Sequence, residues 1–378
     1  MKKIAVLHNF LDNIGGAEVV SLTLAREFNA DLYTSNFDAN RIASVGFGDV
    51  VPRIVAIGKV PRRAPFRHQL ALRLFRRLDL GKKYDFYIIS GDWAVGAAVN
   101  NKPNLWYAHG PLNELWAFKD FVGAKMIAAW KRPIFEVWVR MNRMLTRRYA
   151  RNVGTWACNS ENSRARIQKF YGAESSVIYP PIDTRLYSCE PDRGYWLSVN
   201  RLLDNKRVDI QMKAFAKMPD KKLVIVGSYE KGARQFEDYK RYIESLQPAN
   251  VELRHWVPAD ELICLYAGAR GFITTSRDED FGMTAVEAMA AGKLVIAPNE
   301  GGYRESVVSG ETGLLIDDID ETKLAAAVEK LDQELRNPAM RERYKEKSQA
   351  RARLFDVSVF AAKIRRLIED EIRNKKQS

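Results

Sequence analysis

The stretch GFITTSRDEDFGMTAVEAMAAGKLVIAP, residues 271–298, predicts a strand, a polar loop, a helix and a second strand in direct succession. Residues 271–276 and 293–298 are short, mostly apolar runs of the length expected for buried strands. Residues 281–292, between them, read as a helix. Continuous apolar strands that are joined by helices are typical of a parallel sheet covered on both faces.

Two series of such units follow one another along the chain. The segment VIYPPID (177–183), a strand stub, a Pro-Pro pair and a turn, separates them as a linker. We therefore expect an α/β protein with two Rossmann-like, doubly wound domains, residues 1–180 and 181–355, facing each other across a ligand-binding cleft. The tail, residues 356–378, predicts a final helix. The other predicted strands are 4–10, 30–35, 53–58, 84–91, 105–110 and 154–160, then 195–200, 222–228, 251–257 and 313–317.

The composition agrees with a globular protein of two domains. The chain has 378 residues, with 46% hydrophobic and 28% charged content. No run approaches the about 18 apolar residues that span a bilayer, and the start, MKKIAVLHNF, reads as a buried strand and not as a signal peptide. Three cysteines and four histidines without metal-ligand spacing disfavour a zinc site and fit a reduced cytosolic protein.

The excess positive charge is confined to one half of the chain. The formal net charge is +13, and residues 1–180 hold 27 Lys and Arg against 14 Asp and Glu, whereas the remainder holds 33 of each sign. Such a one-sided excess indicates an anionic partner for the first half. A nucleic acid is disfavoured as that partner, because no recognisable nucleic-acid-binding motif is present and the second half is neutral.

Two loops at strand ends have the residue types that bind a nucleotide diphosphate. The loop DNIGGAEVV places Gly15 and Gly16 before a helix whose first amides can face an anion. The loop NRLLDNKRVD offers Arg201 and Lys206, a fork and a point charge suited to a pyrophosphate. Each loop also has an ordinary explanation: a plain turn for the first and two solvated cations for the second.

A third loop, RDED, lies between the strand and the helix of the opening stretch. Glu279 stands just ahead of this helix, and Glu287 lies two turns inside it. Two interpretations are open: Asp278-Glu279-Asp280 is a metal site of the Asp-x-Asp kind, or the two glutamates each accept hydrogen bonds from hydroxyls of one bound molecule. The first helical amides form a site for an anion or a hydroxyl: Phe281, Gly282 and Met283.

Glu279-x7-Glu287, with FG inside it and EAMAAG after it, resembles the signature of the GT4-type retaining glycosyltransferases of the GT-B fold. The resemblance spans nearly the whole chain and is stronger in the second half. It implies that the final helix returns to the first domain. It also implies a reaction without a metal, so that Asp278-Glu279-Asp280 only looks like a metal motif. The companion motifs follow in order: IGGAE, YAHGP (107–111), CNSENSRARI (158–167), IYPPID, NRLLDNKRVD and GGYRESV (301–307).

The resemblance assigns roles in binding the nucleotide part of the donor. Arg201 and Lys206 match the pair that neutralises the donor pyrophosphate and the leaving nucleotide. Gly16, with Gly15 beside it, matches the loop glycine near the donor phosphate. Glu287 matches the carboxylate that holds the ribose hydroxyls.

The resemblance also assigns contacts to the sugar and the base. Glu279 matches the carboxylate against the donor sugar, beside the amides at the start of the helix. His109 matches the histidine of the first domain that contacts the transferred sugar, and Val257 matches a backbone contact to the base. The sequence departs from the family at Asn200, where many members have glycine, and at GSYEKG, which replaces the commoner G-x-G-P.

The implied reaction is hexosyl transfer with retention at the anomeric carbon. No enzyme nucleophile is evident, so we expect attack from the front face, with the leaving phosphate accepting the proton of the acceptor. The motifs look most like those of mannosyltransferases that use GDP-mannose to build surface polysaccharides, acting on a glycan or a lipid-linked acceptor. UDP-glucose and UDP-N-acetylglucosamine remain alternative donors, and a sugar-nucleotide epimerase on the same fold is a less favoured alternative.

Two basic segments in the first half point to the acceptor. Residues 121–151 carry eight Lys or Arg and one acid, Glu136, and residues 62–77 carry six arginines. A basic, tryptophan-bearing amphipathic helix suits an anionic membrane surface, which predicts a cytoplasmic protein at the inner face of the membrane. The same apolar stripe is equally well explained as core packing. The basic residues are Lys125, Lys131, Arg132, Arg140, Arg143, Arg147, Arg148 and Arg151, then Arg62, Arg63, Arg67, Arg73, Arg76 and Arg77; the stripe is Ile127, Trp130, Ile134, Val137, Trp138, Met141 and Leu145.

Overall fold

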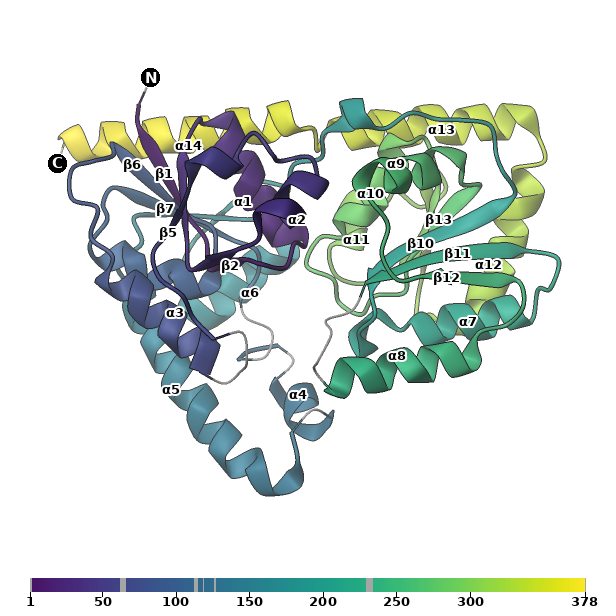
Figure 1. The fold of residues 1–378 in the computed structure, drawn as a ribbon. Helices are drawn as coiled ribbons and strands as arrows, with labels where there is room; N and C mark the ends of the chain where they lie inside the picture. Colours follow the sequence, from purple (N-terminus) through teal and green to yellow (C-terminus); the bar gives the residue numbers. More distant parts are fainter. Residues whose placement is uncertain are drawn as a thin grey trace. The chain divides into compact units, whose positions relative to one another are not determined.

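The computed structural model describes residues 2–61, 66–111, 115–117, 119–125, 127–228 and 234–377, in two compact units (Figure 1). The first unit comprises Met1–Pro181 and Ser358–Ser378, and the second comprises Ile182–Val357. Each unit has its own parallel sheet and its own hydrophobic core. The expected fold class, an α/β chain with two Rossmann-like domains, is confirmed.

The sheet of the first unit has seven parallel strands in the order β5-β3-β1-β6-β7-β8-β9. Every residue of β1, β6 and β7 is buried, because helices cover both faces of the sheet. A separate two-stranded pair, β2 and β4, is too short to be signalled by hydrophobic periodicity. The strands are β1 (Ile4–Leu7), β2 (Phe10–Leu11), β3 (Asp31–Thr34), β4 (Asn36–Phe37), β5 (Ile54–Ala56), β6 (Phe86–Ile89), β7 (Asn104–Ala108), β8 (Thr155–Cys158) and β9 (Ser176–Val177).

The helices of the first unit include the final helix of the chain. Phe360, Ile364 and Ile368 lie on one face of this helix, α14, and are buried. The ring of Phe360 packs edge-on against Tyr107 of β7, and Thr155 of β8 donates a hydrogen bond of 2.6 Å to the carboxylate of Glu371. The helices are α1 (Gly16–Glu27), α2 (Ala39–Ser44), α3 (Phe66–Arg77), α4 (Lys119–Lys125), α5 (Arg132–Ala150), α6 (Glu161–Tyr171) and α14 (Val357–Gln377), with 3-10 turns at Val51–Arg53, Asp92–Val99 and Ala129–Lys131.

The sheet of the second unit has six parallel strands in the order β12-β11-β10-β13-β14-β15. The central neighbours β10 and β13 lead directly into the two loops that carry the predicted donor contacts. The strands are β10 (Tyr195–Arg201), β11 (Lys222–Ser228), β12 (Val251–Arg254), β13 (Gly271–Ile273), β14 (Val295–Pro298) and β15 (Gly313–Ile316). The helices are α7 (Val208–Ala216), α8 (Arg234–Leu246), α9 (Ala259–Gly268), α10 (Met283–Ala290), α11 (Tyr303–Ser306), α12 (Glu321–Glu334) and α13 (Pro338–Arg353), with 3-10 turns at Thr184–Leu186 and Asp204–Lys206.

The chain enters and leaves the second unit side by side. The amide of Ile182 donates to the carbonyl of Phe355 at 2.9 Å, and the amide of Val357 donates to the carbonyl of Ile182 at 3.1 Å. The hydroxyl of Thr184 donates to the Asp356 carboxylate at 2.6 Å and closes this junction. Among the described helices, none is both long and apolar enough to cross a membrane.

Candidate functional site

The loop after β13 holds a carboxylate against a lysine. Glu279 accepts hydrogen bonds from the ammonium of Lys206 and from the hydroxyl of Ser276. Lys206 ends the short turn that follows β10, the strand next to β13, so that adjacent parallel strands bring the two side chains together at one sheet edge. The side chains are 15% exposed for Lys206 and 24% exposed for Glu279, so the pair can be reached from outside.

The charges around Glu279 keep it ionised. Burial by itself raises the pKa of this carboxyl, but the charge and hydrogen bond of Lys206, the hydroxyl of Ser276 and the charge of Arg201 outweigh it, and the pKa is lowered. Arg201, at the end of β10, is exposed. The structure thus brings together three of the predicted donor contacts, Arg201, Lys206 and Glu279, as two cations around one carboxylate.

A second arginine, which the sequence analysis missed, ties the two loops to each other. Arg207 has a left-handed backbone, with φ of 49°, and its Nε donates to the carbonyl of Thr275 at 2.6 Å. Its guanidinium forms an ion pair with Glu300, whose other carboxylate oxygen accepts from the amide of Asp278 at 3.3 Å. In addition, the amide of Arg277 donates to the carbonyl of Asn205 at 2.8 Å. These bonds fix the distance between Lys206 and Glu279.

Two glycines allow the chain to pass close behind this loop. The amide of Gly302 donates to the carbonyl of Glu279 at 2.8 Å. A Cβ on Gly302 would lie 2.4 Å from the Cα of Phe281, and a Cβ on Gly301 would lie 2.4 Å from the carbonyl oxygen of Glu279. Gly282, which has φ of +86°, precedes the first residue of α10, Met283. The start of α10 is therefore packed into one position. The helix begins at Met283, so Phe281 and Gly282, which were expected to be its first residues, precede it, and the anion site at these amides stays a prediction.

The other predicted carboxylate, Glu287, lies in a different environment. It is partly buried on α10, and its carboxylate accepts a hydrogen bond of 2.8 Å from the hydroxyl of Tyr266 on α9. Burial raises the pKa of Glu287, and the Tyr266 hydroxyl offsets only part of this effect. The two glutamates therefore have opposite electrostatics: the site favours the charged form of Glu279 and disfavours that of Glu287.

This contrast predicts opposite effects of neutralising the two residues. The lowered pKa of Glu279 stabilises the folded state above the pKa of the unfolded chain, and this stability is lost as the pH falls. For Glu287 the pKa is raised, so ionisation costs stability as the pH rises through the folded-state value. We expect Glu279→Gln to lower the free energy of unfolding at pH 7 by about 2 kcal/mol, and Glu287→Gln to increase it. Thermal unfolding at pH 7 and pH 4 measures both, and changes of the same sign at pH 7 would contradict the assignment.

The stretch Asp278-Glu279-Asp280, which resembles a metal motif, lies in a sharp turn. Asp278 has a left-handed backbone, with φ of 45°, and the loop turns at this point. In the part of the chain that the structure describes, no group of three or more His, Cys, Asp or Glu side chains is arranged to hold a metal ion.

In the first unit, three polar residues each follow directly on one of three neighbouring strands. His8 follows β1, Ser90 follows β6 and His109 follows β7. The Nε2 of His109 lies 2.9 Å from the hydroxyl of Ser90. Burial, with a smaller contribution from His8, lowers the pKa of His109 to about 3, so its imidazole is neutral at physiological pH. Sequence reasoning found His109 but missed its two partners.

The glycine loop of the first unit is capped by its own helix. Gly15 is the N-cap of α1, Gly16 is its first residue, and the Gly15 amide donates to the Glu18 carboxylate at 2.9 Å. Glu18 therefore occupies the amide of the N-cap residue, which lies just ahead of the helical amides that the sequence offers to an anion. The last predicted contact, Val257, is partly buried in the loop between β12 and α9.

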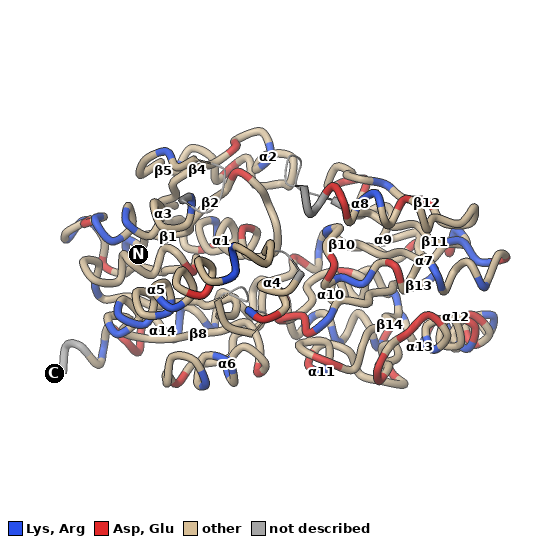
Figure 2. Tube along the Cα trace, turned by 90° about the horizontal axis from the view of Figure 1, so that it is seen from below, with Lys and Arg blue, Asp and Glu red and all other residues tan. Residues whose placement is uncertain are grey.

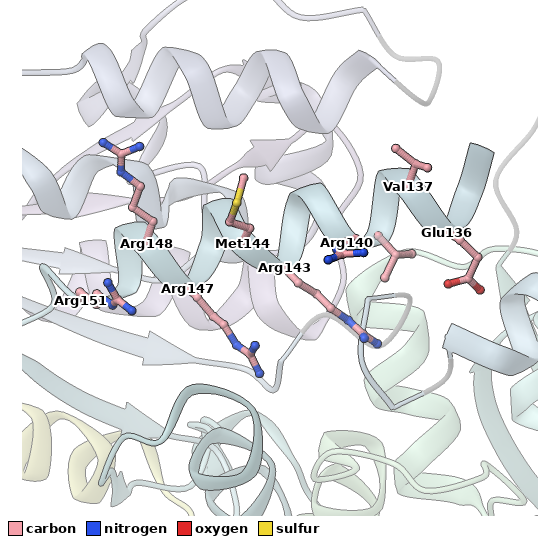
Figure 3. A pocket seen from close by; sticks show the side chains of 9 residues that line it. Glu136, Val137, Arg140, Arg143, Met144, Arg147, Arg148 and Arg151 are labelled. Carbon is pink, nitrogen blue, oxygen red and sulfur yellow. The ribbon is translucent and has the colours of Figure 1, made fainter. Parts of the chain in front are cut away.

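The basic segment of the first unit, residues 121–151, was expected to be one helix, but it is divided among α4, the 3-10 turn Ala129–Lys131 and α5. Helix α5 carries most of its arginines (Figure 2). The predicted apolar stripe is divided. Trp138 and Leu145 pack against the core, whereas Trp130 is 73% exposed and Val137 is 69% exposed. Ile134 and Met141 are also exposed, and so is Met144, which was not part of the predicted stripe. Arginine side chains of this segment line an open groove of about 890 Å³ (Figure 3). The groove is lined by Arg140, Arg143, Arg147, Arg148 and Arg151 with Glu136, Val137, Val139 and Met144.

The second predicted basic segment is less available. Arg67, on α3, is 13% exposed and forms an ion pair with Asp12 inside the unit. The expectation that Arg67 is a free surface cation is therefore wrong. Arg76 hydrogen-bonds to Asn100. Arg62, Arg63 and the side chain of Lys125 lie outside the described residues.

The chain matches two family models that together cover most of its length. Residues 14–186 match "Glycosyltransferase Family 4" and residues 189–351 match "Glycosyl transferases group 1". The D-inositol 3-phosphate glycosyltransferase of Corynebacterium glutamicum (strain R) is 30% identical over 248 residues, which is 59% of each chain. The GDP-mannose-dependent alpha-(1-6)-phosphatidylinositol monomannoside mannosyltransferase of Mycolicibacterium smegmatis is 26% identical over 254 residues, 59% of this chain and 65% of that protein. Both alignments span less than two thirds of the relative.

Solved structures support the same fold. The Anabaena HepE structure, in complex with UDP and glucose, superimposes with a TM-score of 0.76 at 20% identity, covering 98% of this chain and 100% of that one. The two family models meet near the junction between the two units, and the structural match runs through both. The chain belongs to the GT4 glycosyltransferases, with the GT-B fold.

Proposed function

We propose that the chain transfers a hexose from a nucleotide sugar, with GDP-mannose as the favoured donor, to a glycan or a lipid-linked acceptor, with retention at the anomeric carbon and without a metal. The observation that carries this proposal is the cluster of Arg201, Lys206 and Glu279 at the start of α10, with Glu287 inside the same helix. Two cations at the carboxyl end of β10 suit a diphosphate, and two carboxylates suit the hydroxyls of a sugar and a ribose.

The proposed mechanism assigns the stabilisation of negative charge to side chains and amides. Arg201, Lys206 and the first amides of α10 stabilise the charge that develops on the leaving diphosphate. Lys206 is held by Glu279 in this structure, so a bound diphosphate competes with this carboxylate for the ammonium. Glu279 then turns to the sugar hydroxyls, and Glu287 accepts from the ribose. The acceptor hydroxyl attacks from the side of the leaving group, and a phosphate oxygen takes its proton.

The identity of the donor is tested by thermal unfolding with GDP-mannose, UDP-glucose, UDP-N-acetylglucosamine, GDP and UDP, each with and without EDTA. A ligand at 100 times its dissociation constant stabilises the folded state by about 2.7 kcal/mol. The GDP-mannose dependence of the Mycolicibacterium relative supports the first donor, and the UDP and glucose in Anabaena HepE keep the second as an alternative. A shift with the UDP ligands alone would overturn the mannosyl proposal, and a shift only with added divalent cation would overturn metal independence.

We further propose that α5 binds an anionic lipid surface, which presents the lipid-linked acceptor. Its exposed apolar residues alternate with arginines, and Glu136 is the one acid along this helix, which is the charge pattern of an interfacial helix. If α5 instead bound a soluble partner protein, binding of the protein to vesicles would not depend on the charge of the lipid. If α5 binds a membrane surface, this binding should depend on anionic lipid.

Replacing Arg140, Arg147 and Arg148 together with Ala should weaken binding to vesicles that contain phosphatidylglycerol by about 100-fold, since each basic residue contributes about 1 kcal/mol near such a surface. The matched control replaces Lys213, Arg241 and Arg336, three exposed cations of the second unit. Vesicle co-sedimentation measures both variants. The proposed lipid-binding surface would be wrong if the wild type bound equally well to vesicles of phosphatidylcholine alone. It would also be wrong if the control variant lost as much binding as the α5 variant.

A further inference from the structure

A chain of buried polar groups runs behind His109 in the first unit. His8, Ser21 and Ser90 are each at most 1% exposed. The Nδ1 of His8 lies 2.8 Å from the Ser21 hydroxyl, which lies 2.8 Å from the Ser90 hydroxyl, which in turn lies 2.9 Å from Nε2 of His109. At the other end, Nε2 of His8 lies 3.4 Å from a carboxylate oxygen of Glu18. This series of hydrogen-bonded groups therefore links α1 to the ends of three neighbouring strands.

The direction of the hydrogen bonds follows from the partners of Ser21. Its hydroxyl has three neighbours, and one of them, the carbonyl of Ala17 at 2.8 Å, can only accept. The single proton of Ser21 therefore goes to Ala17, a back-bond within the helix. The two lone pairs of Ser21 must then accept from His8 and from Ser90.

The same count fixes the proton on His109. Because Ser90 gives its proton to Ser21, its oxygen can only accept from His109, and Nε2 of His109 must carry the hydrogen. A neutral imidazole with a proton on Nε2 has its lone pair on Nδ1. The low pKa of His109, caused by burial and then by His8, keeps the ring neutral.

Glu18 joins this series to the glycine loop. One of its carboxylate oxygens lies 3.4 Å from Nε2 of His8, and the other accepts from the Gly15 amide at 2.9 Å.

We propose that His8, Ser21 and Ser90 are positioning residues that hold His109 as the Nε2–H tautomer, so that its Nδ1 accepts a hydrogen bond from a hydroxyl of the transferred sugar. This role toward the sugar rests on the proposed function; the order of the protons does not. Two further contacts orient His109: the side-chain amide of Asn159 donates to its carbonyl at 2.6 Å, and the ring of Tyr107 lies edge-on at 5.2 Å.

The test is two-bond ¹H–¹⁵N NMR of the full chain labelled in its histidine side chains. The chain has four histidines, His8, His68, His109 and His255, and single replacements by Gln assign them. At pH 7 we expect His109 as the neutral Nε2–H tautomer, and we expect His8 to carry a proton on Nδ1. In Ser21→Ala, Ser90 loses its acceptor and can donate to Nε2, so we expect His109 to shift toward the Nδ1–H tautomer.

The matched control is Thr23→Val, which removes a hydroxyl that makes the same kind of back-bond in the same helix, to Val19 at 2.9 Å. It should leave the His109 tautomer unchanged.

Once a donor has been identified, kinetics gives a second test. Ser21→Ala should lower kcat about tenfold, which corresponds to about 1.4 kcal/mol, with little change in the KM for the donor. Ser21→Thr should restore kcat.

Three results would overturn the proposal in whole or in part. An Nδ1–H or doubly protonated His109 in the wild type, or an unchanged tautomer in Ser21→Ala, would overturn the order of protons even if the enzyme binds nucleotide sugars. The expected tautomers together with no binding of any nucleotide sugar would leave the hydrogen-bond order intact and overturn the role toward a sugar.

Discussion

Lys206→Ala is expected to lower kcat by about 10³-fold, because it removes a cation from the charge that develops on the leaving diphosphate. The same change leaves the Glu279 carboxylate without its main partner, so the pKa of Glu279 rises toward the value that burial favours. Steady-state kinetics with the donor identified by thermal unfolding measures the effect on kcat. Lys213→Ala, which removes an exposed lysine of α7 paired with Asp209 at 3.2 Å, should retain activity.

A double variant separates catalysis from folding at this position. Loss of one partner of a partly buried ion pair destabilises a protein by about 3 kcal/mol, so Lys206→Ala should also lower the melting temperature. In Lys206→Ala with Glu279→Gln, no unpaired carboxylate remains, and we expect much of the stability to return while activity stays low. If Lys206→Ala retained kcat within threefold of the wild type, the role of Lys206 in leaving-group stabilisation would be wrong.

Gly301→Ala is expected to reduce both stability and catalysis. Gly301 has φ of +58°, and an added Cβ would lie 2.4 Å from the carbonyl oxygen and 2.8 Å from the amide nitrogen of Glu279. The left-handed backbone costs an alanine about 1 kcal/mol, and the clash adds about 2 kcal/mol because it displaces backbone rather than a flexible side chain. Displacement of Glu279 should lower kcat/KM by about 100-fold, the loss that a misplacement of about 1 Å can cause.

The control for Gly301→Ala is Gly310→Ala in the same unit. Gly310 also has a left-handed backbone, with φ of +81°, but a Cβ there would meet no atom within 4 Å. It should therefore lose about 1 kcal/mol and keep its activity. Chemical denaturation and kinetics of both variants give the comparison, and equal losses in the two would show that backbone strain, not contact with Glu279, explains the effect.

The fold was predictable because its strands are buried on both faces. Runs such as YDFYIISG and KLVIVGS are apolar without alternation, and helical segments separate them, which leaves few arrangements other than a parallel sheet. The two-residue strands β2 and β4 were not predictable, because two residues carry no periodicity. Helical spacing also could not tell which part of the apolar stripe in residues 127–145 would pack: Trp138 and Leu145 do, but Trp130 and Val137 do not.

The candidate site was predictable only in part. Arg201, Lys206 and Glu279 stand at strand ends, and neighbouring strands bring strand ends together whatever the details of the loops. The Arg207–Glu300 pair and the Tyr266 bond to Glu287 depend on a left-handed residue and on contacts between distant elements, for which the sequence has no local signal. His8 and Ser90 did have one: like His109, each is the first residue after a buried strand.

The most direct test of the central claim, that the second unit binds a nucleotide sugar through this cluster without a metal, is calorimetric titration of GDP-mannose in EDTA. We predict binding by the wild type that is weakened at least about tenfold in Glu287→Ala, since a ribose hydroxyl then loses its acceptor at a cost of about 1.4 kcal/mol. Binding that requires a divalent cation, or that is the same in Glu287→Ala as in the wild type, would contradict the account.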